Sequence, residues 1–376
     1  MSMQTALFNL HDMILIMTAA FSVLLALPLL LRRGGLPQDR LLAQFILVQG
    51  LLAAYYLLLY ADFSRPTTVA LTLPYQVVPI AVCFAAQGPL LYWFSQSVAG
   101  VARTGHRRAL IVFASVVALP MLLRFVSGVD RDYGPKYDGI FLTLPALTAS
   151  IAYGIGAMRT VYLHEQWIEE RYSNLEAVNL VWLGYVALGF VGVWLIRLVH
   201  YLLGMSGQHD LEQAMALASN LPPLLLIAAL VTLGLGRSRG VSLVEEARAP
   251  DQPSERSDSN PSPELIARLD NLMCNVRVYE DPNLDREGLA DSLGVSPRTL
   301  SACVNGHFDQ TFYEYVNGFR IDAAKRALRD PDKVQQSIQR VFEEAGFNSK
   351  STFNTLFKKS TGVTPSQYRQ KHLRAG

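Results

Sequence analysis

The sequence predicts an all-α protein in which a polytopic seven-helix transmembrane bundle is followed by a soluble α-helical domain with two helix-turn-helix units. First, a composition of 51% hydrophobic and 17% charged residues is too apolar for an ordinary soluble chain of 376 residues. Second, long apolar runs fill the chain before residue 237. Third, one helical pattern occurs twice in the last quarter. We therefore expect a transmembrane domain at 1–240, a disordered tether at 241–262 and a soluble domain at 263–376.

Seven segments each hold close to the roughly 20 apolar residues that are needed to cross a bilayer core. The predicted spans are Met13–Leu31, Leu41–Tyr60, Tyr75–Val98, Leu110–Val126, Gly139–Met158, Val178–Leu203 and Leu217–Leu235. The start of the chain lacks the basic region of a cleaved signal peptide, so we interpret the first apolar run as a true span.

Arginines are concentrated in alternate loops of this bundle. They follow spans one, three, five and seven, at Arg32, Arg33, Arg40, Arg103, Arg107, Arg108, Arg159, Arg171, Arg237 and Arg239. The other loops hold few basic residues or balance them with Asp. By the positive-inside rule, the N-terminus is outside and the C-terminal domain is in the cytoplasm, which predicts a multi-pass protein of the cytoplasmic membrane.

Four polar side chains within the predicted spans fall on the outer side of the bilayer midplane, where each is costly enough to require a reason. They are Arg124, Arg197, His200 and Asn220. Arg197 and His200 are three residues apart and share a helix face, so a pocket there would suit an anionic or carboxylate ligand. Alternatively, the arginines extend toward lipid phosphates while His200 and Asn220 form interhelical hydrogen bonds.

Small residues recur at four-residue spacing in span five, at Ala146, Ser150 and Gly154. Such a stripe permits close approach of a second helix. It is equally consistent with packing inside the bundle and with a homodimer.

The stretch from Val241 to Pro263 is rich in Pro, Ser, Asp and Glu and has almost no apolar residues. This composition predicts a disordered cytoplasmic tether. About 20 residues of such a chain have a root-mean-square reach of roughly 25 Å. The soluble domain is therefore expected to work within tens of ångströms of the membrane.

The run from Ile338 to Arg369 has a helix-turn-helix pattern. Its first helix places Ile338, Val341, Phe342 and Ala345 on one face, and Gly346 and Phe347 break it. Ser349 is a good N-cap for a second helix with Phe353, Leu356 and Phe357 on its apolar face. The opposite face is polar or cationic and suits a DNA groove: Lys350, Ser351, Asn354, Thr355 and Lys358.

The same pattern occurs earlier, and its turn glycines, Gly294 and Gly346, lie 52 residues apart. In the first copy Ser296 is the N-cap and Pro297 the first helical residue. Its inward face comprises Leu289, Ala290, Leu293, Leu300, Cys303 and Val304, and its outward face comprises Arg298, Thr299, Ser301, Ala302 and Asn305. Between the copies, apolar residues from Phe312 to Leu328 predict an amphipathic helix of about 18 residues, roughly 27 Å long.

Residues from about Pro263 to Lys371 resemble the DNA-binding domain of the AraC/XylS family of bacterial transcription regulators. The motifs that carry the resemblance are AGF at 345–347, STFNTLFKKSTGVTPSQYR at 351–369, and Phe319, Arg320, Ala323, Ala324 and Leu328. The resemblance implies that Arg298, Ser301, Ala302, Lys350, Asn354 and Thr355 face base edges. Members of that family often have Arg where this chain has Ala302 and Thr355.

Charge is distributed unevenly over this domain. Residues 320–376 hold 12 Lys and Arg against 5 Asp and Glu, a net charge of +7, whereas residues 263–319 hold 4 against 9, a net charge of −5. We therefore expect the second unit to supply most of the attraction to DNA phosphates.

The sequence offers little for catalysis. The run HEQWIEER, at 164–171, lacks the second His of a zinc-protease motif and is better interpreted as a solvated amphipathic helix in the loop between spans five and six. Neither a GxSxG motif nor a Gly-rich phosphate loop occurs, and the three cysteines have no pairing or metal-ligand spacing. We therefore predict that the protein is not an enzyme and has no cofactor or metal.

The predicted partners follow from these parts. They are duplex DNA, a lipid bilayer, RNA polymerase, an unidentified small-molecule or protein signal, and a second copy of the chain. Three uses of the membrane helices stay open: they couple a signal to gene expression, they form a small-molecule receptor or carrier, or they only anchor the DNA-binding domain.

Overall fold

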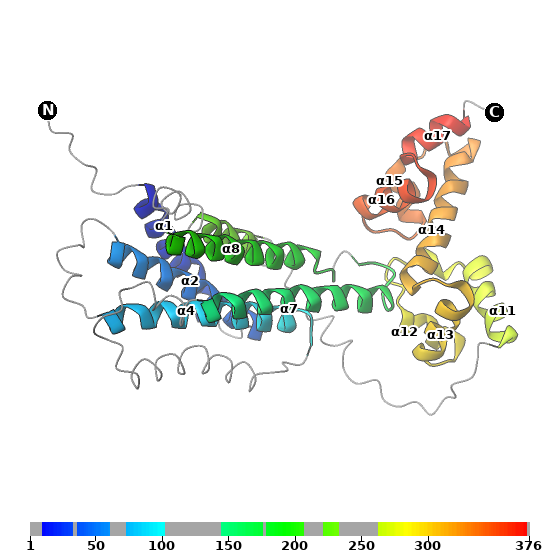
Figure 1. The fold of residues 1–376 in the computed structure, drawn as a ribbon. Coiled ribbons are helices and arrows are strands. Elements are labelled where there is room, and N and C mark those ends of the chain that lie inside the picture. The colour runs from blue at the N-terminus through cyan, green and yellow to red at the C-terminus, as the bar shows by residue number, and fades with distance from the viewer. Residues whose placement is uncertain are drawn as a thin grey trace. The chain divides into compact units, whose positions relative to one another are not determined.

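The computed structural model describes residues 10–32, 36–60, 73–101, 144–175, 178–206, 221–232 and 262–373, and every regular element in these ranges is helical (Figure 1). The chain forms two compact units. Unit 1 contains Met1–Tyr162 and Leu180–Arg248, and unit 2 contains Leu163–Asn179 and Ala249–Gly376. The predicted span Leu110–Val126, the tether up to residue 261, Arg124 and Asn220 lie outside the described residues.

Long helices make up the described part of unit 1. They are α1 (Leu10–Leu31), α2 (Pro37–Tyr60), α4 (Leu73–Val98), α7 (Leu144–Glu169), α8 (Val181–Ser206) and a shorter apolar helix, Leu221–Thr232. Their core contains aromatic contacts between helices, such as the edge-to-face pair of Phe84 and Trp194 with ring centroids 5.2 Å apart. Each helix overlaps a span that the apolar pattern predicts.

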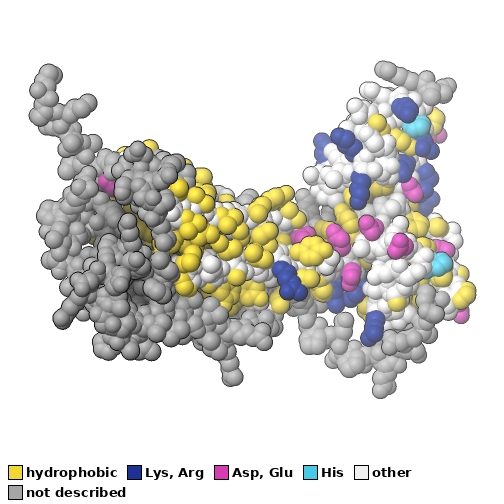
Figure 2. Space-filling model, viewed as in Figure 1, with side chains coloured by type: hydrophobic (Ala, Val, Ile, Leu, Met, Phe, Trp, Pro, Cys, Tyr) yellow, Lys and Arg dark blue, Asp and Glu magenta, His cyan; other side chains and the backbone are white. Residues whose placement is uncertain are grey.

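Three rather than seven helices among the described residues are long and apolar enough to cross a membrane. They are Asp12–Leu31 in α1, Pro37–Leu58 in α2 and Val181–Leu203 in α8. Many of their large apolar side chains are exposed, among them Leu24, Leu31, Tyr185 and Leu188. Figure 2 shows a broad hydrophobic surface on this unit. An exposed apolar surface of this extent is typical of contact with lipid or with a protein partner.

The other predicted spans agree only in part with the described helices. α4 coincides with Tyr75–Val98, but the side chains of its first nine residues lie outside the described set. α7 is less apolar than the three candidate spans because it contains Thr148, Ser150, Tyr153 and Arg159. It also continues 11 residues beyond Met158, the predicted end of span five. Of the predicted seventh span, the structure describes residues 221–232, which form the apolar helix Leu221–Thr232.

The small-residue stripe of α7 packs inside unit 1. The hydroxyl of Ser150 donates a hydrogen bond to the carbonyl oxygen of Phe84 on α4, at 3.1 Å. A Cβ atom on Gly154 would lie 2.7 Å from Val191 Cγ2 on α8. Of the two interpretations of this stripe, the structure therefore supports packing within the bundle.

Unit 2 contains the C-terminal domain. Its helices are α11 (Pro263–Asn271), η4 (Leu272–Val276), η5 (Val278–Glu280), α12 (Arg286–Leu293), α13 (Pro297–Phe308), α14 (Phe312–Arg329), η6 (Pro331–Lys333), α15 (Ile338–Glu344), α16 (Lys350–Thr361) and α17 (Pro365–Leu373). The 18 residues of α14 agree with the predicted amphipathic helix.

Two separate hydrophobic cores lie in this domain, and α14 contributes to both. The first half of α14 packs Phe312, Tyr315 and Val316 against α12 and α13. The second half packs Ile321, Ala324 and Leu328 with residues of α15 and α16. One helix therefore holds two helix-turn-helix units, α12 with α13 and α15 with α16, as the sequence predicts.

Candidate nucleic-acid interface

Local sequence signals define the first helix-turn-helix unit. The carboxylate of Asp285 caps α12 by accepting a hydrogen bond from the Gly288 amide at 2.8 Å. α12 ends at Gly294, whose φ of 67° is in the left-handed region that favours glycine. Ser296 then caps α13, accepting from the Thr299 amide at 3.1 Å, and Pro297 is the first helical residue. The predicted turn and cap are confirmed.

The second unit repeats these signals with a tighter turn. Ser349 caps α16 by accepting from the Thr352 amide at 3.4 Å. Gly346 has a φ of 89°, and a Cβ atom there would lie 2.3 Å from the carbonyl oxygen of Tyr279. No larger residue fits without displacing the backbone. Gly346 therefore allows the second unit to pack directly against η5.

We call α13 and α16 the reading helices. Their inward faces agree with the prediction: Leu300, Cys303, Val304, Phe353 and Phe357 are buried, and Leu356 is partly buried. Seven of the ten predicted DNA-facing residues are exposed: Arg298, Ala302, Asn305, Lys350, Ser351, Thr355 and Lys358. The remaining three, Thr299, Ser301 and Asn354, are half-buried.

The two hydroxyl groups among these half-buried side chains already form hydrogen bonds within the domain. Thr299 Oγ1 lies 2.7 Å from Ser296 Oγ, so this side chain supports the cap. Ser301 Oγ accepts a hydrogen bond from Arg286 Nη1 at 3.3 Å. The sequence places Ser301 on the outward face, but in this structure its hydroxyl is held by a residue of α12.

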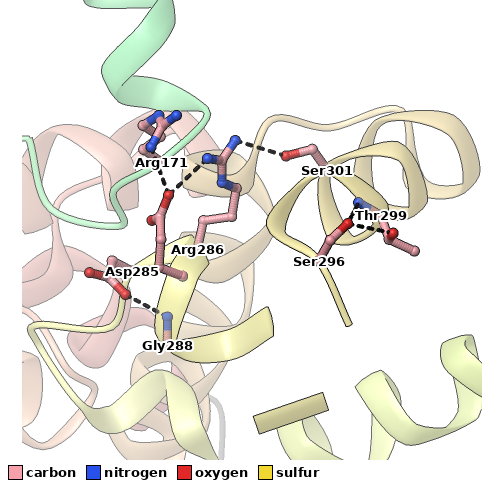
Figure 3. Close-up of polar contacts among 8 residues, drawn as sticks. Arg171, Asp285, Arg286, Gly288, Ser296, Thr299 and Ser301 are labelled. Atoms are coloured by element: carbon pink, nitrogen blue, oxygen red, sulfur yellow. Dashed lines mark hydrogen bonds and ion pairs between the residues drawn. The ribbon is translucent and has the colours of Figure 1, made fainter. Parts of the chain in front are cut away.

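Arg286 belongs to a small charged cluster beside the first reading helix (Figure 3). Its Nη2 lies 2.8 Å from Glu287 Oε1, and Arg171 Nη1 lies 2.8 Å from the same oxygen. One carboxylate oxygen is therefore shared by two guanidinium groups, and a line of polar contacts joins Arg171 to Ser301 through Glu287 and Arg286. No short sequence motif marks Arg286 or Glu287, so the sequence alone did not indicate a role for them.

Arg320 does not belong to the surface that attracts DNA. The net charge of residues 320–376 includes this arginine, but only 1% of Arg320 is exposed. Its Nε donates to the carbonyl oxygen of Tyr279 at 2.8 Å, and its Nη2 donates to that of Asp281 at 2.7 Å. Burial lowers the pKa of Arg320 to about 10, so the guanidinium is still charged at neutral pH. This arginine joins η5, α14 and the turn before α16.

Apart from Arg320, positive charge is concentrated on the second helix-turn-helix unit, as the sequence predicts. Figure 2 shows Lys and Arg side chains gathered over the part of the domain formed by α14 to α17. Lys350, Lys358 and Lys359 are exposed on α16. The second unit therefore presents more positive charge to a phosphate backbone than the first.

Two of the four predicted pocket residues are described. Arg197, on α8, is 8% exposed, and its guanidinium carbon lies 5.1 Å from the ring centroid of Phe84 and 5.6 Å from that of Trp194. Within the described residues, its Nε and Nη1 atoms have no hydrogen-bond partner. The arginine therefore lies between aromatic rings inside unit 1 rather than at its surface. His200 follows one turn later on the same helix.

Comparisons with known proteins agree with this geometry. Residues 289–371 match the family described as "Helix-turn-helix domain". The chain is 30% identical over 104 residues to the HTH-type transcriptional activator RhaS of Escherichia fergusonii, covering 28% of this chain and 36% of that protein. It is 33% identical over 113 residues to the HTH-type transcriptional regulator YijO of Escherichia coli, covering 29% and 39%.

A third relative connects the domain to a family. A Streptomyces lividans protein described as an AraC-like transcription regulator is 34% identical over 82 residues, covering 22% of this chain and 26% of that protein. The chain thus spans less than two fifths of the length of each of these relatives, and no solved structure matches it significantly. The C-terminal domain is an AraC-type helix-turn-helix DNA-binding domain.

Proposed function

We propose that the chain is a membrane-embedded, sequence-specific DNA-binding transcription regulator that couples a signal at the membrane to gene expression. The observation that carries this proposal is the pair of reading helices, each with a buried apolar face and an exposed polar or cationic face, in a region that matches a helix-turn-helix family. Supporting evidence for the membrane comes from three long apolar helices in unit 1.

The proposed DNA contact follows from the arrangement of the two units around α14. In helix-turn-helix proteins the second helix of each unit lies in the major groove and its side chains contact base edges. Successive major-groove segments on one side of a duplex are about 34 Å apart. The 18 residues of α14 span roughly 27 Å, so one chain bridges two such segments. Arg298 and Lys350 are expected to contact bases, and Lys358 a phosphate.

The proposed membrane domain has seven spans, an external N-terminus and a cytoplasmic C-terminus. Catalysis is not needed for signalling by such a protein, because a ligand has only to shift an equilibrium between conformations or oligomers that present the DNA-binding domain differently. RNA polymerase and a second copy of the chain are proposed partners in that readout.

Crosslinking of the full chain to DNA in cells tests the proposed function. We expect recovery of a limited set of duplex sites by the full chain, and loss of most of that recovery on Arg298→Ala combined with Lys350→Ala. Arg277→Ala is a matched control, because this exposed arginine lies outside both reading helices and pairs with Glu280. Recovery that is unchanged by the double variant would contradict the proposal.

Reporter fusions after residues 33, 103 and 238 test the topology, and the reporter of each fusion is expected to be cytoplasmic.

A receptor is the second candidate function, and the buried position of Arg197 favours it. A guanidinium held among Phe84 and Trp194, with two donors lacking partners among the described residues, is suited to a carboxylate or another anion. Arg197→Ala and His200→Ala are expected to abolish the response to an inducer while DNA occupancy persists. Unchanged induction would exclude this pocket.

An anchor is the remaining alternative. If the helices only hold the DNA-binding domain at the membrane, replacing them with an unrelated bundle of the same topology will preserve regulation. If they sense a signal, the same replacement will make occupancy independent of growth conditions.

A further inference from the structure

A short segment from the middle of the chain belongs to the same compact unit as the DNA-binding domain. We call residues 163–175 the docking segment. It contains the last two turns of α7 and the turn and loop residues after them, and unit 2 includes it. Its helical part was expected to be a solvated loop helix, but His164 and Ile168 are buried. The segment leads onward to α8, a candidate membrane span.

The backbone of the docking segment pairs with the loop before α12. The Arg286 amide donates a hydrogen bond to the carbonyl oxygen of Arg171 at 2.9 Å. Tyr172 and Asp285 form an antiparallel bridge, and the Ser173 hydroxyl donates to the carbonyl oxygen of Leu284. Backbone pairing fixes the register, because a slip of one residue would turn every side chain to the opposite side.

A buried polar socket on the DNA-binding domain receives Ser173. The carbonyl oxygen of Ser173 accepts from Asn317 Nδ2 at 3.0 Å and from Arg320 Nη1 at 3.2 Å. Its hydroxyl oxygen accepts from Arg320 Nη2 at 3.0 Å. Buried donors are costly unless they have acceptors, so the socket selects a segment that supplies a carbonyl and a hydroxyl at this position.

Two features connect the docked segment to the DNA-contacting surface. The first is the line of contacts in Figure 3, from Arg171 through Glu287 and Arg286 to Ser301 on the first reading helix. The second is charge: the segment contains Glu165, Glu169 and Glu170 against one arginine.

Of these acidic side chains, Glu169 is close enough to Lys359, on the second reading helix, for their charges to interact. Because phosphate attraction dominates DNA affinity, acidic charge beside a reading helix opposes DNA binding.

We propose that residues 163–175 dock reversibly on the DNA-binding domain and that the docked segment holds this domain in a state of low DNA affinity. This inference rests on the proposed function. Docking pairs Arg171 with Glu287, whose neighbour Arg286 holds the Ser301 hydroxyl, and it keeps acidic charge near Lys359. Release removes the ion pair with Glu287 and takes the acidic charge away from Lys359. Because the segment is continuous with α7 and α8, a movement of either helix pulls on it directly.

A disulfide between Tyr172→Cys and Asp285→Cys tests the proposal in the full chain. Residues paired across an antiparallel bridge have Cα atoms about 4.5–5.5 Å apart, within the range of a disulfide. The chain is prepared in inverted membrane vesicles with the exposed Cys274 changed to serine, and it is titrated with a duplex recovered by the full chain in cells. Oxidation is expected to crosslink the pair and to lower DNA affinity about tenfold. Oxidation should leave the DNA affinity of each single-cysteine variant unchanged.

A second variant avoids any disturbance of the Asp285 cap. Arg171→Ala removes the ion pair between the segment and Glu287 and is expected to raise DNA affinity several-fold. Arg159→Ala, at an exposed arginine earlier on α7, is the matched control and is expected to change nothing.

The outcomes separate the two proposals. Failure to crosslink, or a crosslinked form that binds DNA as tightly as the reduced form, overturns autoinhibition. If Arg298→Ala still weakens binding in that case, the proposed function stands. Binding that is insensitive to Arg298 in both forms overturns both proposals.

Discussion

The two helix-turn-helix units share a sequence pattern and a local fold, but their surroundings differ. The first unit contacts the docking segment through Arg286 and Glu287, and its reading helix carries one exposed cation, Arg298. The reading helix of the second unit carries three exposed lysines, Lys350, Lys358 and Lys359. The repeated pattern therefore determines the helices of both units. The residues around each copy differ, and we expect this difference to give the two units different roles. We expect base contacts from both reading helices, regulation through the first unit and most of the phosphate attraction from the second.

The turn glycines provide the largest expected difference between the units. Gly346→Ala should lower the free energy of unfolding by about 3 kcal/mol or more, because a left-handed alanine costs about 1–2 kcal/mol and its Cβ would also overlap the Tyr279 carbonyl. Gly294→Ala should cost only about 1–2 kcal/mol, since the nearest atom to its Cβ is 3.9 Å away. Protease resistance of the C-terminal domain of the full chain, measured across a urea series, reports both values. Equal losses would refute the packing argument.

Substitutions on the reading helices sharpen the assignment of tasks. Arg298→Ala should cost about 1–3 kcal/mol at particular base pairs. Lys358→Ala should weaken binding to all sequences and reduce the salt slope by about 1. Affinities for a panel of single-base operator variants at several salt concentrations distinguish these results. If both variants lose affinity uniformly, the assignment of Arg298 to a base edge is wrong.

The smallest expected effect is a pH dependence of docking. Burial and the nearby Glu314 raise the pKa of Glu169 when the segment is docked, whereas Lys359 lowers it. Tyr313 also interacts electrostatically with Glu169. The docked state therefore binds a proton more tightly than the released state, and docking should weaken as pH rises through the raised pKa. The yield of the disulfide between the cysteines introduced at positions 172 and 285, compared between acidic and neutral pH, measures this effect.

Glu169→Gln is the matched control for the pH dependence. It should dock well throughout this range and lose the pH dependence that belongs to Glu169. An unchanged pH profile in Glu169→Gln would show that another group is responsible.

Sequence patterns were sufficient for the elements that local physics determines. The caps at Ser296 and Ser349, the proline at Pro297 and the turn glycines each act within one helical turn, so their residue types indicate the structure directly. The buried faces of α13 and α16 follow from apolar residues at helical spacing. The two-unit domain was predictable for these reasons.

Long-range contacts were not predictable in the same way. Ser173 and Arg320 are 147 positions apart, and neither residue type indicates a buried partner. Arg320 is included in the net charge of +7 that was expected to attract DNA phosphates, because a charge count does not separate buried from exposed residues. The helix at 164–169 was expected to be solvated, but His164 and Ile168 are buried. Arg171, just after this helix, pairs with Glu287, which is 116 positions away. In unit 1, three of the seven predicted spans have the expected length and apolarity within the described residues.

The central claim is that the membrane helices control a DNA-binding domain. Its most direct test is genome-wide crosslinking of the full chain and of the fragment from Val241 to Gly376, in the same cells under several growth conditions. We predict that occupancy by the full chain changes with conditions, whereas the fragment, which lacks the docking segment, occupies the same sites constantly. Occupancy that is the same for both chains under every condition would contradict this account and would reduce the helices to an anchor.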